Sequence, residues 1–75
     1  MIGYSQQLVK ANKSANQKLL GVQLGKHCIK KDIPVAHVAK SFGVSRTAVY
    51  AWFKGESEMS DAHFAIARKF YIKTA

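Results

Sequence analysis

The feature that most constrains this sequence is a pair of short apolar stripes on either side of a glycine, between Val35 and Gly55. In the first stripe, apolar residues recur at positions i, i+3, i+4 and i+7, which predicts a short amphipathic helix. Gly43 then ends that helix, because glycine adopts the left-handed conformation of a helix C-terminus at little cost. The residues of this first stripe are Val35, Val38, Ala39 and Phe42.

A second helix is predicted directly after this glycine. We expect Val44 to be buried in the turn between the two helices. Ser45 is a residue type whose side-chain oxygen caps helix N-termini. We expect the helix from Arg46 to about Lys54, closed by Gly55. Its inward residues would be Val49, Trp52 and Phe53, and its outward residues Arg46, Thr47, Tyr50, Ala51 and Lys54.

Helical periodicity also precedes this pair of helices. From Asn16 to Lys31, apolar residues fall at helical spacing, and Ile33-Pro34 ends the segment because proline disfavours helical geometry in the residue before it. Gly21 and Gly25 would each weaken this helix by roughly 1 kcal/mol relative to alanine, so we interpret them as points of close packing. The apolar positions are Leu20, Leu24, Cys28 and Ile29.

The sequence predicts a helix at the C-terminal end of the chain and a basic arm at the N-terminal end. Ser60 is the expected cap of a last helix, with Asp61 in the first turn, where the helix dipole favours negative charge. Its apolar stripe would comprise Phe64, Ala67, Phe70 and Tyr71. Residues 1–15 are polar and contain lysines, and we expect a basic arm that is either mobile or a frayed helix. The sequence therefore predicts one all-α domain of four or five helices at residues 16–75, preceded by this arm.

The charge balance indicates a polyanionic partner. Twelve Lys and Arg residues face four acids, which gives a net charge of +8 at pH 7. No acid precedes Asp32, whereas six lysines do, and the other acids are Glu56, Glu58 and Asp61. Such a field concentrates polyanions around the protein. Charge alone does not separate DNA, RNA and an anionic membrane as the partner.

The segment VAHVAKSFGVSRTAVYAWFKG, Val35 to Gly55, resembles the helix-turn-helix of the Cro and phage-repressor type, also called lambda-repressor-like. The resemblance extends over about residues 16–71, with Leu20, Leu24, Ile29 and Ile33 as the expected first-helix core. Two departures stand out. Where relatives often pair an Arg with a Glu, this chain has Cys28 and Phe53, so an apolar contact would replace the ion pair. Where relatives often use a phosphate-binding Gln, it has Val35.

The resemblance implies specific contacts with double-stranded DNA, because this type of motif places its second helix in the major groove. Arg46 would donate two hydrogen bonds to a guanine, and Thr47 would contact a base or a thymine methyl group. Tyr50 and Ala51 would face the groove. Ser45, Lys54 and Lys40 would contact phosphates, and Lys10 and Lys13 would either enter the minor groove or belong to a solvated tail. Relatives often bind palindromes, so a homodimer is a further expectation.

Residues suited to catalysis are scattered. His27, His37, His63 and Cys28 are the candidates, and adjacent His27 and Cys28 point in different directions on a helix. We therefore expect no enzyme, no cofactor and no metal site. No apolar run has the length of a signal peptide or a membrane span, which predicts a soluble, cytoplasmic protein.

Two alternatives to duplex binding remain open. A small helical adaptor could use the same fold to bind a protein such as a polymerase, a nucleoid protein or a toxin, and the acidic stretch from Glu56 to Asp61 would suit such a partner. Binding of single-stranded nucleic acid would require exposed aromatic residues on a sheet or in a groove. The outward face of the helix after Ser45 separates these hypotheses, because an adaptor would present apolar residues there.

Overall fold

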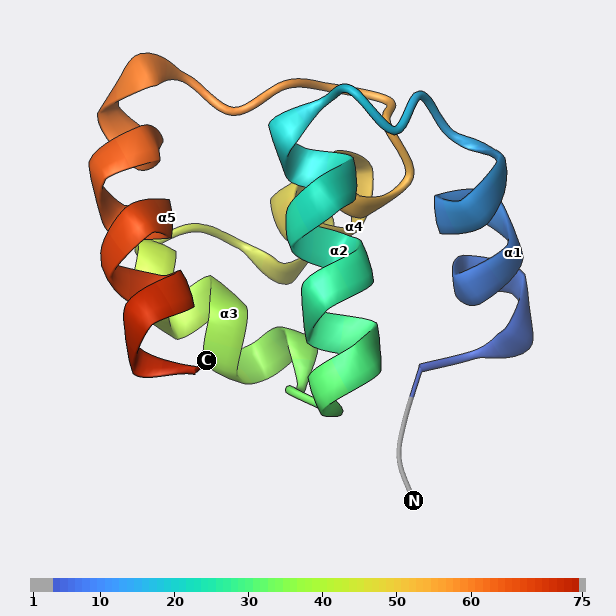
Figure 1. Ribbon diagram of the computed structural model, residues 1–75, viewed down its shortest axis with the longest axis horizontal. Coiled ribbons are helices and arrows are strands. Elements are labelled where there is room, and N and C mark those ends of the chain that lie inside the picture. Colours follow the sequence, from blue (N-terminus) through green and yellow to red (C-terminus); the bar gives the residue numbers. More distant parts are fainter. Residues whose placement is uncertain (1–3, 75) are drawn as a thin grey trace.

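The computed structural model describes residues 4–74, and this part of the chain contains helices and no strand. The architecture is therefore all-α, as predicted (Figure 1). The helices are α1 (Gln6–Ser14), α2 (Leu20–Lys31), α3 (Val35–Phe42), α4 (Arg46–Phe53) and α5 (Asp61–Lys73).

The pair α3–α4 has the local geometry that the sequence predicts. Gly43 follows α3 in the left-handed conformation, with φ of 68°. Ser45 occupies the N-cap of α4, where its Oγ accepts a hydrogen bond from the Ala48 N–H at 3.2 Å. Gly55 is also left-handed, with φ of 75°, and it turns the chain away after α4. Short-range chemistry thus determines both ends of α4.

A single core joins the five helices. The predicted stripe on α3 and the predicted inward residues of α4 are buried in it, which confirms both assignments. The glycines of α2 allow the close contact with α4. A Cβ on Gly21 would lie 2.8 Å from Trp52 Cβ, and one on Gly25 would lie 2.8 Å from Phe53 Cγ. Both distances are shorter than side-chain packing permits, so the glycines are required by the helix crossing.

The described part of the N-terminal segment is a helix, which was one of the two expected alternatives, but this helix is packed rather than frayed. Residues 6–14 form α1, which packs against α2 and α4. Leu8 and Asn12 are buried on its inner face, and the Tyr4 hydroxyl donates a hydrogen bond to the Ile33 carbonyl. These contacts explain the order of the segment, because they satisfy polar groups and remove apolar surface from water. The part of the expected arm before Tyr4 lies outside the described residues.

Two expected core residues lie at the surface instead. Leu20 is 43% exposed and Phe64 is 39% exposed. Helix α2 begins at Leu20 rather than near Asn16, because the preceding residues form the turn that ends α1. In this turn the Gln17 side chain donates hydrogen bonds to carbonyls at the end of α1. The buried side chains of α2 are Val22, Leu24 and Cys28, while Ile29, which was expected in the core, is half-buried.

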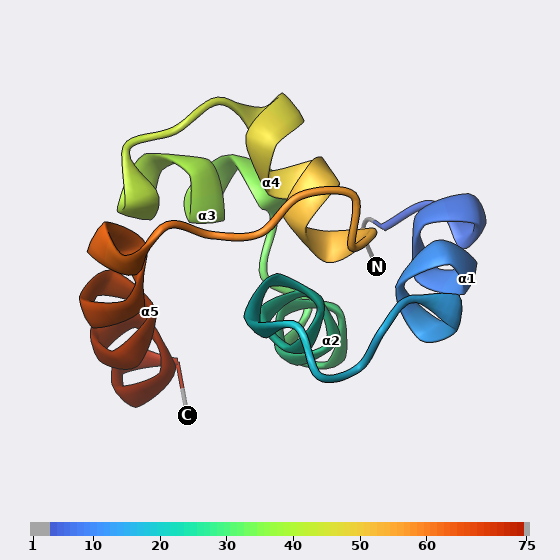
Figure 2. The same ribbon diagram turned by 90° about the horizontal axis from the view of Figure 1, so that it is seen from above.

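The loop before α5 also differs in detail. Ser60 occupies the N-cap position, but its hydroxyl bonds to the His63 ring rather than to a backbone N–H. Met59 is buried and takes part in the core beside Ala67 and Phe70. Figure 2 shows the resulting arrangement: α1 and α5 lie at opposite ends of the molecule, with α2 and the pair α3–α4 between them. Helix α4 is therefore flanked by α1, α2 and α3.

Candidate nucleic-acid interface

Helix α4 is held rigidly by its inner face. Val49 and Phe53 are completely buried, and Trp52 is nearly so. The Trp52 ring meets Phe42 of α3 edge to face, with ring centroids 5.6 Å apart. Aromatic pairs favour this arrangement because the positive edge of one ring meets the negative face of the other. These anchors fix which residues of α4 point into solvent.

The outward face of α4 presents polar side chains at its N-terminal end. Arg46 and Thr47 are exposed, and Tyr50, one turn further on, is 40% exposed. Ala51 was expected beside them but is half-buried. The exposed face is therefore narrower than the sequence suggests, and Arg46, Thr47 and Tyr50 make up its polar part.

Three further residues were expected to contact a nucleic-acid backbone. Lys40, in the last turn of α3, is exposed. Ser45 is exposed too, and because its Oγ accepts a bond from Ala48, its hydroxyl proton is still free to be donated. Lys54 is only half-buried, and its Nζ lies 3.7 Å from Glu56 Oε2. A surface pair of this kind contributes roughly 0–1 kcal/mol, so a phosphate can compete with Glu56 for the lysine.

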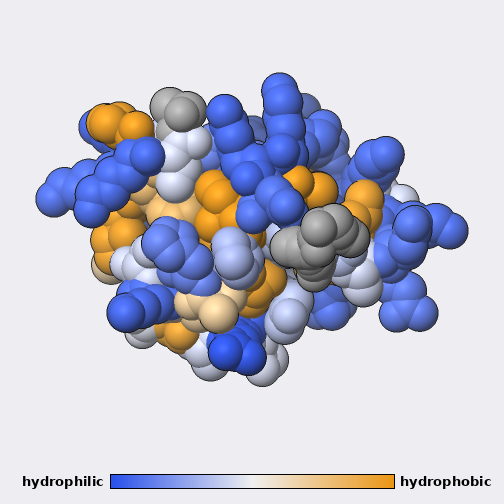
Figure 3. Space-filling view, turned by 90° about the horizontal axis from the view of Figure 1, so that it is seen from below, coloured by the Kyte–Doolittle hydropathy of each residue, from blue (hydrophilic) through white to orange (hydrophobic). Residues whose placement is uncertain are grey.

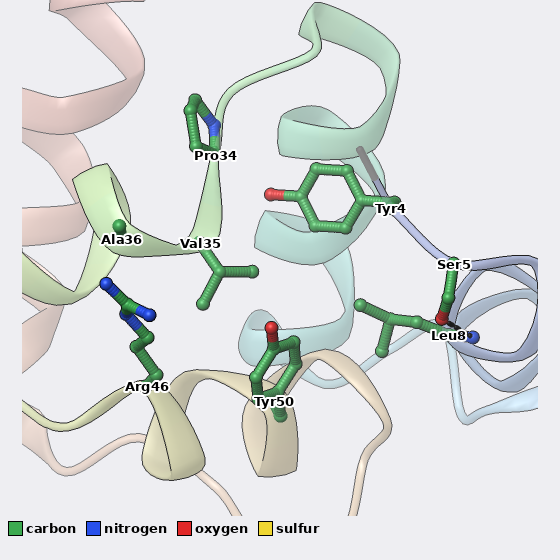
Figure 4. A pocket seen from close by; sticks show the side chains of 8 residues that line it. All are labelled: Tyr4, Ser5, Leu8, Pro34, Val35, Ala36, Arg46 and Tyr50. Carbon is green, nitrogen blue, oxygen red and sulfur yellow. Dashed lines mark hydrogen bonds between the residues drawn. The ribbon is translucent and has the colours of Figure 1, made fainter. Parts of the chain in front are cut away.

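A hollow of about 400 Å³ lies beside this face of α4. Arg46 and Tyr50 reach into it from α4, Val35 lies at its base, and Ser5 and Leu8 border it from α1 (Figure 4). A second hollow of about 420 Å³ lies between α1 and α4. It is lined by Ser5, Gln7, Leu8, Ala11, Tyr50 and Lys54.

The contribution of α1 to this surface was missed in the sequence. Tyr4, Leu8 and Asn12 recur at intervals of four residues, which is a helical spacing, but the series contains a polar member. Because asparagine is usually exposed, this spacing did not predict a buried helix face. Here the Asn12 amide is buried and donates to the carbonyls of Val22 and Phe53, at 3.0 and 2.8 Å.

Lysines stand on the outer surface of several helices. Lys10 and Lys13 are exposed on the packed helix α1 and therefore do not belong to a solvated tail. Figure 3 shows one face of the molecule, on which hydrophilic side chains project around the margin and hydrophobic surface appears between them. With twelve basic side chains against four acids, this exterior favours an anionic partner.

Two residues considered for catalysis, Cys28 and His27, lie in the core and at its edge. Burial raises the pKa of the Cys28 thiol to about 12, so the thiol stays protonated near neutral pH. His27 Nε2 lies 2.8 Å from Thr74 Oγ1 and its ring packs edge to face on Tyr71. Among residues 4–74, no three His, Cys, Asp or Glu side chains come together as metal ligands would. Within the same residues, no helix is long and apolar enough to cross a membrane.

Comparison of the chain with models of protein families, with curated proteins and with solved structures gives no match. The function is therefore inferred from the residues of the chain and their geometry.

Proposed function

We propose that this protein binds double-stranded DNA sequence-specifically through α3–α4, as a small transcriptional regulator of the phage-repressor or bacterial type. The outward face of α4 carries the proposal. It presents Arg46, Thr47 and Tyr50 on a helix whose other side is locked in the core. An arginine at the leading end of a helix can read guanine with two hydrogen bonds, and each such pair contributes about 1–3 kcal/mol of base discrimination.

The surroundings of α4 support this proposal. Lys40 and Ser45 are exposed and Lys54 is half-buried, and on this proposal all three hold phosphates, which positions the helix without reading sequence. The excess of basic residues would supply the attraction that is common to all duplexes. On this proposal the protein is not an enzyme and needs no cofactor or metal. If two copies bind together as a homodimer, their natural DNA site is a palindrome.

The proposal is tested by measuring the affinity of the purified protein for a labelled pool of random duplexes at several salt concentrations. The logarithm of the affinity should fall linearly with the logarithm of salt, with a slope of about −0.9 per neutralised phosphate. Repeated selection from the same pool should then enrich one sequence. If no duplex binds in a salt-dependent manner, the DNA proposal is wrong.

A second candidate function is supported by a different surface. Leu20 and Phe64 are exposed beside a largely apolar hollow of about 290 Å³ between α2 and α5. Apolar side chains exposed together often mark protein contacts, so an adaptor that binds a partner protein is the alternative. Phe64→Ser distinguishes the two functions. It should leave the affinity for DNA unchanged if α4 binds DNA, and it should abolish partner binding if the protein is an adaptor.

A further inference from the structure

The two hollows beside α4 are neighbours, and together they are called the groove below. Both are lined by Ser5, Leu8 and Tyr50, so they adjoin along the junction between α1 and α4. Arg46 borders the first hollow and Lys54 borders the second. The groove therefore runs beside the exposed face of α4, from its first residue to its C-cap.

The lining of this groove is apolar at its base and rich in hydrogen-bond donors at its sides. Leu8 and Val35 are buried and Ala11 is half-buried, whereas the donors on either side are Ser5, Gln7, Arg46, Tyr50 and Lys54. No carboxylate lines either hollow. A sugar–phosphate chain alternates apolar sugars with anionic phosphates, and this lining complements both parts.

Helix α1 presents its side of the groove in a fixed position. The Asn12 amide ties the helix to the end of α4, and Tyr4 ties its start to the residue before Pro34. A side chain on such a helix loses less conformational freedom on binding than one on a mobile arm, which favours affinity.

We infer that one sugar–phosphate strand of the bound duplex lies in this groove, so that α1 is a second DNA-contacting element. The inference rests on the proposed function. Arg46 and Tyr50, two of the proposed base-facing residues, also form one side of the groove, so a duplex seated on α4 brings its backbone to α1. Gln7 and Ser5 then donate hydrogen bonds to phosphate oxygens on the side opposite Lys54.

Gln7 and Gln6 form a matched pair for testing this assignment. Both are exposed in the first turn of α1, but Gln7 lines the groove and Gln6 does not. Changing either residue to Glu adds the same charge at neighbouring positions of the first helical turn, so dipole effects and general repulsion are similar. Gln7→Glu should lower the affinity for a selected duplex on the order of tenfold more than Gln6→Glu does, because it loses a bond to a charged group.

The opposite change extends the test. Gln7→Lys should tighten binding and steepen the salt dependence by about one unit of slope, whereas Gln6→Lys should change the slope by much less. Thermal unfolding of each variant verifies that the fold is unchanged. If the wild-type protein binds duplex but the variants at the two positions are equivalent, α1 does not contact DNA. If the wild-type protein binds no duplex, the proposed function and the role of α1 are both overturned.

Discussion

The side-chain amide of Asn12 donates a hydrogen bond of 2.8 Å to the carbonyl oxygen of Phe53, and this contact joins α1 to the C-terminal end of α4. The last carbonyls of a helix lack partners within the helix, so a buried donor at this point satisfies an acceptor that would otherwise lose its bond to water. The same amide donates to Val22, so one side chain connects α1, α2 and α4.

Asn12→Ala should therefore lower the free energy of unfolding by about 1–3 kcal/mol, because it leaves a buried acceptor without its partner. Chemical denaturation followed by circular dichroism measures the change. Asn16→Ala is the matched control, since Asn16 is exposed and bonds only locally to the Lys18 N–H. Equal effects of the two substitutions would show that the Asn12 bridge does not stabilise the fold.

Gly21→Ala should destabilise the protein despite the better helix propensity of alanine. The added Cβ would lie 2.8 Å from Trp52 Cβ and 2.9 Å from the Trp52 carbonyl oxygen, so α2 and α4 would have to move apart. We expect a net loss of about 1–3 kcal/mol, as for other overpacked cores. The midpoint of urea unfolding measures this loss of stability. The control is Lys26→Ala, on the exposed side of α2, which should change the midpoint little. A more stable Gly21→Ala variant would contradict the observed helix crossing.

Arg46→Ala should weaken binding to a selected duplex by about tenfold to a hundredfold and weaken binding to random duplex much less, because a base contact contributes about 1–3 kcal/mol of discrimination. Lys54→Ala is the comparison, since a phosphate contact is lost on every sequence and should lower the salt slope by about one unit. Both affinities can be measured by fluorescence anisotropy. An equal loss on both duplexes for Arg46→Ala would exclude its base-reading role.

Stability should also decline in weak acid because of His27. Burial lowers the pKa of this ring below its ordinary value of 6.5, and repulsion from the charges of Lys31 and Lys30 lowers the pKa further. The unfolded chain therefore binds the proton more tightly than the folded one. The contribution of neutral His27 is fully present above pH 6.5 and is lost as the pH falls below this value toward the folded pKa.

The measurement for this prediction is the free energy of unfolding at pH 7.5 and at lower pH, in wild type and in His27→Gln. The Thr74 hydroxyl donates to the Phe70 carbonyl, so it accepts a bond from His27 Nε2, and glutamine keeps a donor for it without titrating. The variant should lose less stability on acidification than the wild type. The same acid sensitivity in both proteins would assign the effect to other groups.

The sequence by itself determined the local structure between Val35 and Gly55. Helical spacing, Gly43 and Ser45 are short-range signals, and the structure confirms the helix bounds, the caps and the buried residues of both helices that they predict. Val44, which was expected to be buried in the turn, is only partly buried. The exposure of Arg46, Thr47 and Tyr50 follows from the same spacing, because anchoring one face of a helix leaves the opposite face in solvent. The spacing did not predict that Ala51 is half-buried.

The tertiary structure alone decided the role of the N-terminal segment. Leu8 joins the hydrophobic core because α1 packs against α2 and α4, and Asn12 is buried because carbonyls of α2 and α4 lie within reach of its amide. The tertiary structure also leaves Leu20 and Phe64 exposed, because no element of the described chain covers the edge between α2 and α5. Burial depends on what lies opposite a side chain, and helical periodicity carries no information about that partner.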